Sequence, residues 1–385
     1  MKILLIAPQP FYQDRGTPIA VRLLTQTLGE QGHNVHLLVF HEGEEITIPH
    51  VTIHRNITLP GIFNIKPGLS LKKLICDFFL SIKCIQLIRT GKFDLIHAVE
   101  ESVFMAMVVK KIFKIPYVYD MDSCMSLQLV EKFPSLQLVR RVMEWLEKRA
   151  VINSSGVVAV CQALADIARR FAPDKYIAKI EDITLLATDN EGNDPLREGL
   201  GITGLMVMYV GNLEKYQGID LLIESFREAL AQKDDLNLVI IGGNKEDISF
   251  YEQRAEQLGI HKNIFFCGPR PVHLLGYYLG QADILVSPRM QGNNTPMKIY
   301  SYLDSGKPVL ATRLPTHTQV LDDTIACLVN PATMEMASGI VTLAKDAALR
   351  GNLALNARKR VKEEYSLPAF QRKVAVFYKN LSPLQ

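Results

Sequence analysis

Short apolar runs alternate with amphipathic segments along the first half of the chain. The apolar runs are typical of buried strands and fall at residues 3–7, 35–40, 95–98, 117–119 and 156–160. Thr17 and Pro18 predict a helix start after the first run, because threonine caps free amide groups and proline suits the first helical position. Strands that alternate with helices indicate a parallel sheet covered by helices on both faces.

The same pattern returns in the second half of the chain. Strands are predicted over residues 205–210, 236–241, 263–267, 284–287 and 308–311. The segment between the two sets, residues 189–204, is rich in glycine and has the composition of a linker. We therefore expect an α/β protein with two doubly wound, Rossmann-like domains, residues 1–188 and 189–365. A last helix within 366–385 is expected to pack back on the first domain.

Composition narrows the class of protein. The 385 residues are 48% hydrophobic and 22% charged, which is ordinary for a globular protein and excludes a disordered chain. The net charge of +3 gives no reason to expect a nucleic-acid partner. The six cysteines form no C-x-x-C pair, which favours a reducing, cytoplasmic compartment and no metal site. No uncharged apolar run reaches the length of about 18 residues that a spanning helix needs.

Residues 61–92 combine a basic and an apolar character. Lysine and arginine outnumber acidic residues there, and leucine, isoleucine and phenylalanine recur between them. A basic amphipathic helix can lie on an anionic membrane surface, which would make the protein peripheral to the inner face of a membrane. The alternative is a helix that packs on the core and exposes a solvated basic face.

Ligands of doubly wound sheets bind at the carboxyl ends of strands, and two such domains facing each other form a cleft. The loop after the first strand lacks G-x-G-x-x-G, which counts against a dinucleotide cofactor. Gly16 lies there before a predicted helix N-terminus, where amide groups can hold an anion, although a plain connecting loop is the alternative. His97 and Asp122 end later strands and are candidate site residues; a structural histidine or a capping aspartate are the alternatives.

Two segments of the second half carry a specific resemblance. They are residues 209–224, YVGNLEKYQGIDLLIE, and residues 287–309, SPRMQGNNTPMKIYSYLDSGKPV. Together, and in this order, they resemble the retaining glycosyltransferases of family 4, which have the GT-B fold. The resemblance covers nearly the whole chain. It implies that the second domain holds a nucleotide diphosphate sugar as donor, with no cofactor and usually no metal. It also implies that the first domain holds a glycan, lipid-linked or small-molecule acceptor.

This sequence departs from the family at the positions that usually bind the donor. The arginine and lysine that hold the diphosphate are replaced by Asn212 and Gln217. The family usually has two glutamates, one that contacts the sugar and one that contacts the ribose. These positions are Gln291 and Ser301 here, with two extra residues between them. The histidine that the family usually has on the acceptor side is replaced by Asp122. Because charge develops on the leaving diphosphate, the loss of both cations needs a replacement.

Candidate replacements lie close by in the sequence. Thr295 is predicted to begin a helix whose amide groups face an anion, and Lys298 falls in its first turn. With the Gly16–Thr17 loop, these groups would hold the diphosphate. Neutral side chains suited to sugar hydroxyls are Gln291, Asn293 and Asn294.

The remaining roles follow from the resemblance. The turn with Gly268 and Arg270 would face the nucleobase, and Ser301 the ribose. Asp122 and His97 would line the acceptor side. The catalytic set is therefore Asp122, Lys298 and His97.

Two other functions stay open at this stage. The same fold with weakened anion ligands describes a nucleotide-sugar or glycan-binding homologue without turnover. A sugar-nucleotide epimerase would need carboxylates to move protons at the sugar, and Glu100, Glu101 and Asp122 are the candidates.

Overall fold

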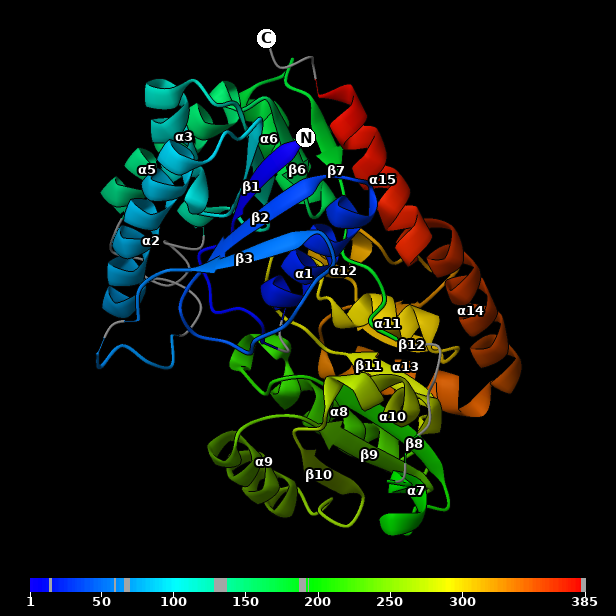
Figure 1. Cartoon of the computed structure of the whole chain (residues 1–385). Coiled ribbons are helices and arrows are strands. Elements are labelled where there is room, and N and C mark those ends of the chain that lie inside the picture. The colour runs from blue at the N-terminus through cyan, green and yellow to red at the C-terminus, as the bar shows by residue number, and fades with distance from the viewer. Residues whose placement is uncertain are drawn as a thin grey trace. The chain divides into compact units, whose positions relative to one another are not determined.

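The chain folds into two compact units, each built on its own parallel sheet (Figure 1). The computed structural model describes residues 1–13, 16–58, 60–65, 70–127, 137–186, 192 and 194–381. Unit 1 comprises Met1–Glu181 and Phe370–Gln385, and unit 2 comprises Asp182–Ala369. The division falls before the glycine-rich segment from which a boundary at 188/189 was expected, and residues 187–191 and 193 lie outside the described residues.

Unit 1 contains the predicted parallel sheet, with seven strands in the order β3-β2-β1-β4-β5-β6-β7. Its strands are β1 (Lys2–Ile6), β2 (Asn34–Val39), β3 (Val51–Arg55), β4 (Leu95–Val99), β5 (Tyr117–Met121), β6 (Gly156–Ala159) and β7 (Ile177–Lys179). The chain runs from β1 to β2 on one side and places β4 on the other side. The carboxyl ends of β1 and β4 therefore form the switch point of this sheet, where ligands of such sheets bind.

Helices cover both faces of this sheet. They are α1 (Gly16–Glu30), α2 (Leu71–Thr90), α3 (Ser102–Phe113), α5 (Gln137–Asn153), α6 (Gln162–Phe171) and α15 (Leu367–Asn380). Helix α2 begins where the Ser70 hydroxyl accepts a hydrogen bond from the Lys73 amide at 3.2 Å. Its buried side chains recur every fourth residue and form one face: Cys76, Leu80, Cys84 and Ile88.

Unit 2 contains six parallel strands in the order β10-β9-β8-β11-β12-β13. They are β8 (Leu205–Val210), β9 (Leu236–Ile241), β10 (Ile264–Gly268), β11 (Ile284–Ser287), β12 (Val309–Thr312) and β13 (Cys327–Val329). The helices are α7 (Leu196–Gly199), α8 (Ile219–Leu230), α9 (Lys245–Gln257), α10 (Leu275–Gln281), α11 (Lys298–Asp304), α12 (Pro315–Thr318), α13 (Thr333–Lys345) and α14 (Ala347–Arg360). The switch point of this sheet lies between β8 and β11.

The structure also bears on disulfide bonds and membrane-spanning helices, neither of which the sequence predicts. All six cysteines lie in described segments, and no disulfide bond joins them. None of the helices in the described part of the chain is long and apolar enough to cross a membrane.

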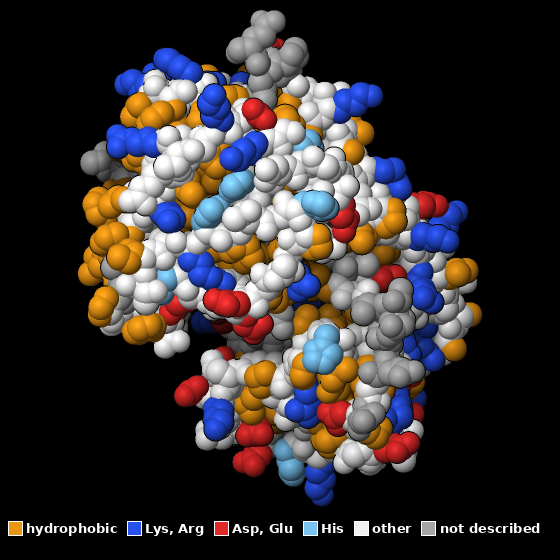
Figure 2. All heavy atoms as spheres, viewed as in Figure 1, with side chains coloured by type: hydrophobic (Ala, Val, Ile, Leu, Met, Phe, Trp, Pro, Cys, Tyr) orange, Lys and Arg blue, Asp and Glu red, His pale blue; other side chains and the backbone are white. Residues whose placement is uncertain are grey.

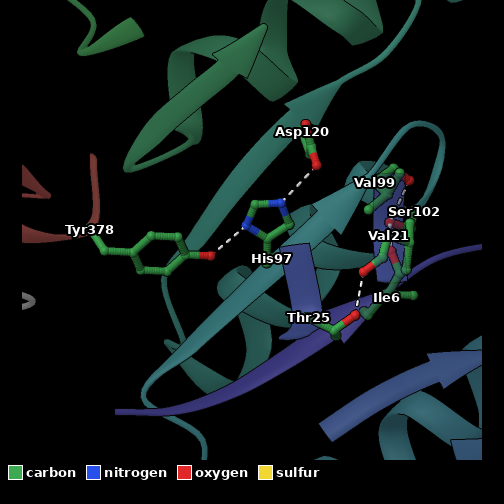
Figure 3. Close-up of polar contacts among 8 residues, drawn as sticks. All are labelled: Ile6, Val21, Thr25, His97, Val99, Ser102, Asp120 and Tyr378. Carbon is green, nitrogen blue, oxygen red and sulfur yellow. Dashed lines mark hydrogen bonds and ion pairs between the residues drawn. The ribbon is translucent and has the colours of Figure 1, made fainter. Parts of the chain in front are cut away.

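Helix α15 is held in unit 1 by a buried polar chain (Figure 3). The Tyr378 hydroxyl lies 2.7 Å from Nδ1 of His97, and Nε2 of His97 lies 2.9 Å from Oδ2 of Asp120. The His97 ring is fully buried and both of its nitrogens are engaged. The expectation that His97 lines the acceptor side is therefore wrong, because this histidine fastens the C-terminal helix and has no surface to offer a ligand.

We expect Tyr378→Phe to destabilise unit 1 by about 1–3 kcal/mol, because it leaves Nδ1 of a buried histidine without a hydrogen-bond partner. Chemical denaturation of the full chain measures the change. The matched control is Tyr119→Phe, since the buried Tyr119 hydroxyl makes no hydrogen bond in the described structure. This control should leave stability equal or higher. Equal stabilities of wild type and Tyr378→Phe would contradict the role of this contact.

Candidate functional site

The loops that follow β8 and β11 join into one site at the switch point of unit 2. The Met290 amide donates a hydrogen bond to the Tyr216 carbonyl at 2.9 Å. Gly218 has a φ of +78°, and a Cβ there would lie 2.0 Å from the Pro288 carbonyl oxygen. Glycine is needed because the two loops approach so closely. We call residues 211–218 together with 288–298 the switch-point site.

Lys298 supplies an uncompensated positive charge to this site. Its ammonium group lies 4.0 Å from the centre of the Tyr209 ring and donates to Oε1 of Gln217 at 3.3 Å. No carboxylate pairs with it in the described part of the chain. Desolvation, followed by repulsion from Arg289, lowers the pKa of Lys298 well below its usual value. An anionic ligand would remove this penalty.

Of the side chains in and next to the site, Arg289 adds a second positive charge and His317 adds none. Arg289 lies over the Tyr216 ring at 5.2 Å, and its Nε donates to the Gln291 carbonyl at 2.7 Å. His317 is fully buried between Ser287 and Thr312. Desolvation lowers the pKa of His317 to about 4, so this ring is neutral at pH 7.

The helix of this site begins later than predicted. Helix α11 starts at Lys298, after the tight-turn hydrogen bond from the Ile299 amide to the Pro296 carbonyl at 2.9 Å. The expectation that Thr295 begins the helix is therefore wrong. The Thr295 side chain is buried, and its hydroxyl makes no hydrogen bond in the described structure. A buried hydroxyl without a hydrogen-bond partner is costly, and this one lies within the switch-point site.

Several residues that the sequence singled out do lie in these loops. Gln217 is buried and accepts from Lys298, whereas Asn212 is exposed and its side chain accepts from the Glu214 amide at 3.4 Å. The remaining members fall in the loop after β11: Gln291, Asn293, Asn294 and Thr295. Their backbone is fixed by neighbours, since the Asn293 and Asn294 carbonyls accept from the side chains of Gln319 and Thr316.

Other predicted residues are engaged elsewhere. Ser301 is fully buried, and its hydroxyl accepts from the Leu185 amide at 3.1 Å, so its expected contact with a ribose is wrong. Arg270 lies 3.3 Å from the carboxylate of Asp194. Gly268 ends β10 with a φ of +65° and accepts from the Gly242 amide at 2.8 Å.

In unit 1, the predicted residues occupy the carboxyl edge of the sheet. Asp122 follows β5 and is partly buried. Gly16 and Thr17 begin α1, and Arg15 lies outside the described residues. No group of His, Cys, Asp or Glu side chains within the described ranges is arranged to hold a metal ion.

Tyr209 and Gly211 were not predicted to have a role, although both shape the environment of Lys298. Tyr209 is the penultimate residue of the buried strand β8, and its hydroxyl donates to the Asn212 carbonyl at 2.6 Å. The sequence does show an aromatic residue two positions before a glycine at the end of a strand. This pattern does not indicate that a lysine from a distant helix lies against both residues.

Family models cover both halves of the chain. Residues 15–180 match the model described as Glycosyltransferase Family 4, and residues 194–360 match Glycosyl transferases group 1. The chain belongs to glycosyltransferase family 4. This confirms the resemblance found in the two segments of unit 2.

Curated relatives of this glycosyltransferase are distant. A phosphatidyl-myo-inositol mannosyltransferase of Mycobacterium leprae is 22% identical over 91% of this chain and 89% of its own length. A D-inositol 3-phosphate glycosyltransferase of Corynebacterium efficiens is 28% identical over 46% of this chain. That match spans 43% of the relative, so this chain aligns with less than half of its length.

Solved structures confirm the GT-B fold. Anabaena HepE in complex with UDP has a TM-score of 0.76 at 17% identity, covering 98% of this chain and all of that one. Sucrose-phosphate synthase of Thermosynechococcus elongatus has a TM-score of 0.78 at 20% identity, covering 99% and 98%.

We expect Gly211→Ala to disrupt the switch-point site. Gly211 has a φ of +151°, and a Cβ there would lie 2.8 Å from Nζ of Lys298 and 2.9 Å from the Tyr209 hydroxyl. Strain and overpacking together should cost about 1–3 kcal/mol of stability and displace Lys298. Denaturation measures the loss, and Gly351→Ala, where a Cβ meets nothing within 4 Å, is the control. Full stability in Gly211→Ala would show that Lys298 does not require this space.

Proposed function

We propose that this glycosyltransferase moves a sugar, with retention and without a metal, from a nucleotide diphosphate sugar to a glycan, lipid-linked or small-molecule acceptor. The observation that carries the proposal is the uncompensated ammonium group of Lys298 in the switch-point site. A desolvated cation without a carboxylate partner favours an anionic ligand at that point.

The contact between Lys298 and Gln217 supports a replacement for the lysine that this loop lacks. Family members usually carry the diphosphate-binding lysine at the position of Gln217. Here Nζ of Lys298 lies 3.3 Å from the Gln217 side chain, so the first residue of α11 delivers the charge to the same place. Arg289, in the loop after β11, adds a second cation in place of the usual arginine.

The remaining polar groups suit the rest of the donor. The unpartnered hydroxyl of Thr295, with Gln291, Asn293 and Asn294, would bind the sugar. The turn at Gly268 would face the nucleobase. HepE was solved with UDP and with UDP-glucose, which supports a nucleoside diphosphate as the ligand class.

Transfer would be driven by stabilisation of the leaving group. As the bond between the anomeric carbon and the phosphate oxygen breaks, negative charge grows on the diphosphate, and Lys298 and Arg289 stabilise it. The acceptor hydroxyl forms the new bond and loses its proton to the departing phosphate. Retention follows if attack comes from the face that the diphosphate leaves.

We expect Lys298→Met to keep the fold but lose the ligand. Removing a desolvated charge should leave the unliganded melting temperature equal or higher, while affinity for UDP, GDP or ADP falls about 10- to 100-fold. Thermal shift measures both effects, because only a ligand that prefers the folded state raises the melting temperature. Lys307→Met is the control, since Lys307 precedes β12 at the opposite edge of the sheet.

Two results would contradict the proposal. If no nucleoside diphosphate shifts the wild-type melting temperature, the donor class is wrong. If Lys298→Met responds to the nucleotide as the wild type does, Lys298 is not the diphosphate ligand. A homologue that binds without turnover is distinguished by donor hydrolysis, which a glycosyltransferase with bound water sustains slowly and a binding protein does not.

We also propose that the enzyme works on the cytoplasmic face of an anionic membrane. Besides its buried face, helix α2 has a second apolar stripe that is exposed to solvent. It is formed by the side chains of Leu71, Leu74, Phe78 and Ile82. Figure 2 shows hydrophobic side chains gathered where α2 lies, with lysine and arginine side chains nearby. The exposed cations Lys72, Arg89 and Lys92 complement anionic headgroups.

We expect Phe78→Asp to reduce binding to vesicles of phosphatidylglycerol and phosphatidylcholine roughly tenfold, because it places a charge in the apolar stripe. Co-sedimentation at low salt measures the bound fraction. Phe250→Asp is a matched control, since Phe250 in unit 2 is 60% exposed and Phe78 is 61% exposed. If the wild-type protein does not bind these vesicles, or if both variants lose binding equally, the exposed stripe of α2 is not a membrane-binding surface.

A further inference from the structure

The switch point of unit 1 carries a glutamate in a costly backbone conformation. Glu100 directly follows β4 and has a φ of +50°, in the left-handed region that favours glycine or asparagine. Its amide donates to the Asp120 carbonyl at 3.0 Å, which fixes the conformation. Ser102 pins the same turn, because its hydroxyl contacts the carbonyls of Ile6 and Val99 at 2.9 and 2.8 Å (Figure 3).

The Glu100 side chain is held in a cluster dominated by carboxyl groups. The Ser123 hydroxyl donates to Oε1 of Glu100 at 3.3 Å. The charged groups that act on it are Glu101, which precedes α3, Lys73 of α2 and Asp120 of β5. Lys73 pairs with Glu101, and Asp77 of α2 lies beside that pair. Desolvation, and then the charge of Glu101, raises the pKa of Glu100 to about 7.

A buried hydroxyl in the same cluster is also without a partner. Tyr119 is completely buried, and its hydroxyl makes no hydrogen bond in the described structure. Its pKa is raised, first by desolvation and then by the charges of Glu147, Cys124, Glu100 and Glu101. A polar group left unsatisfied beside a carboxyl indicates a place completed by a bound polar molecule.

We propose that the Glu100 carboxylate, oriented by Ser123, accepts a hydrogen bond from a hydroxyl group of the sugar or polyol that receives the transferred residue. This proposal rests on the proposed function and assigns the acceptor subsite to the carboxyl end of β4. Because carboxyl groups dominate this edge, the bound part of the acceptor is an uncharged polyol rather than a phosphorylated one.

Folding alone gives no reason for a glutamate at this position. Glycine would adopt the left-handed backbone at lower cost, and glutamine would keep the Ser123 contact without a desolvated charge. A side chain that costs stability in both respects is typical of a ligand-binding residue.

The test compares Glu100→Gln and Glu100→Gly with the wild-type enzyme. The stability readout needs no substrate. The folded-state pKa of about 7 exceeds the usual value of 4.5, so the folded wild type binds the proton more tightly and loses stability as pH rises from 4.5 to above 7. Both variants should therefore melt above the wild type at pH 8, and Glu100→Gln should match it near pH 4.

The activity readout uses the nucleotide sugar with the largest thermal shift as donor and octyl β-D-glucoside as acceptor probe. In Glu100→Gln, KM for the glucoside should rise about 10- to 100-fold and should no longer depend on pH around 7. The increase in melting temperature caused by UDP should stay unchanged. Lys114→Gly is the matched control, since Lys114 also has a left-handed backbone, with a φ of +61°, at the far end of α3. It should gain stability and keep KM.

Variants that melt below the wild type at pH 8 would make Glu100 a structural residue and overturn the proposal. An unchanged KM in an active Glu100→Gln enzyme would do the same while leaving the proposed function intact. A wild-type protein that transfers from no nucleotide sugar would overturn the proposed function, and this proposal with it.

Discussion

The ligand edge of unit 2 is organised around the charge of Lys298. The ammonium group lies over the Tyr209 ring, contacts the Gln217 side chain and occupies space that any side chain at position 211 would fill. None of these neighbours neutralises it. A desolvated cation without a counter-charge lowers the stability of the unliganded protein, and an anionic ligand at this point would relieve that cost.

The two sheets use the same topology to present opposite charges. Each has a switch point where two neighbouring strands send the chain in opposite directions. In unit 2 the groups there are Lys298 and Arg289, and in unit 1 they are Glu100 and its neighbouring carboxyls. The fold therefore provides the location, and the residues after each strand decide whether it suits an anion or a hydroxyl.

Periodicity predicted the central strands well and the sheet edges poorly. Strands β3, β7 and β13, which the sequence did not reveal, each lie at an edge and pair on one side only. Edge strands are partly exposed, so β3 carries His54 and Arg55 and lacks a continuous apolar run. Site residues were harder to predict because their partners are remote: His97 meets Tyr378 across 281 positions. The apolar run around His97 allowed a structural histidine as the alternative, but no local pattern identifies Tyr378 as its partner.

The substituted family positions also bear on whether the chain is an active enzyme. A substituted position that has lost its role without replacement is expected to make no specific contact in the folded chain. Instead, Gln217 accepts from Lys298, and Ser301 is fully buried and supports the Leu185 amide. One substitution is thus matched by a cation from another element, and the other has become part of the core packing. Because Gln217 and Ser301 both make specific contacts, these two positions favour a rearranged site over an abandoned one.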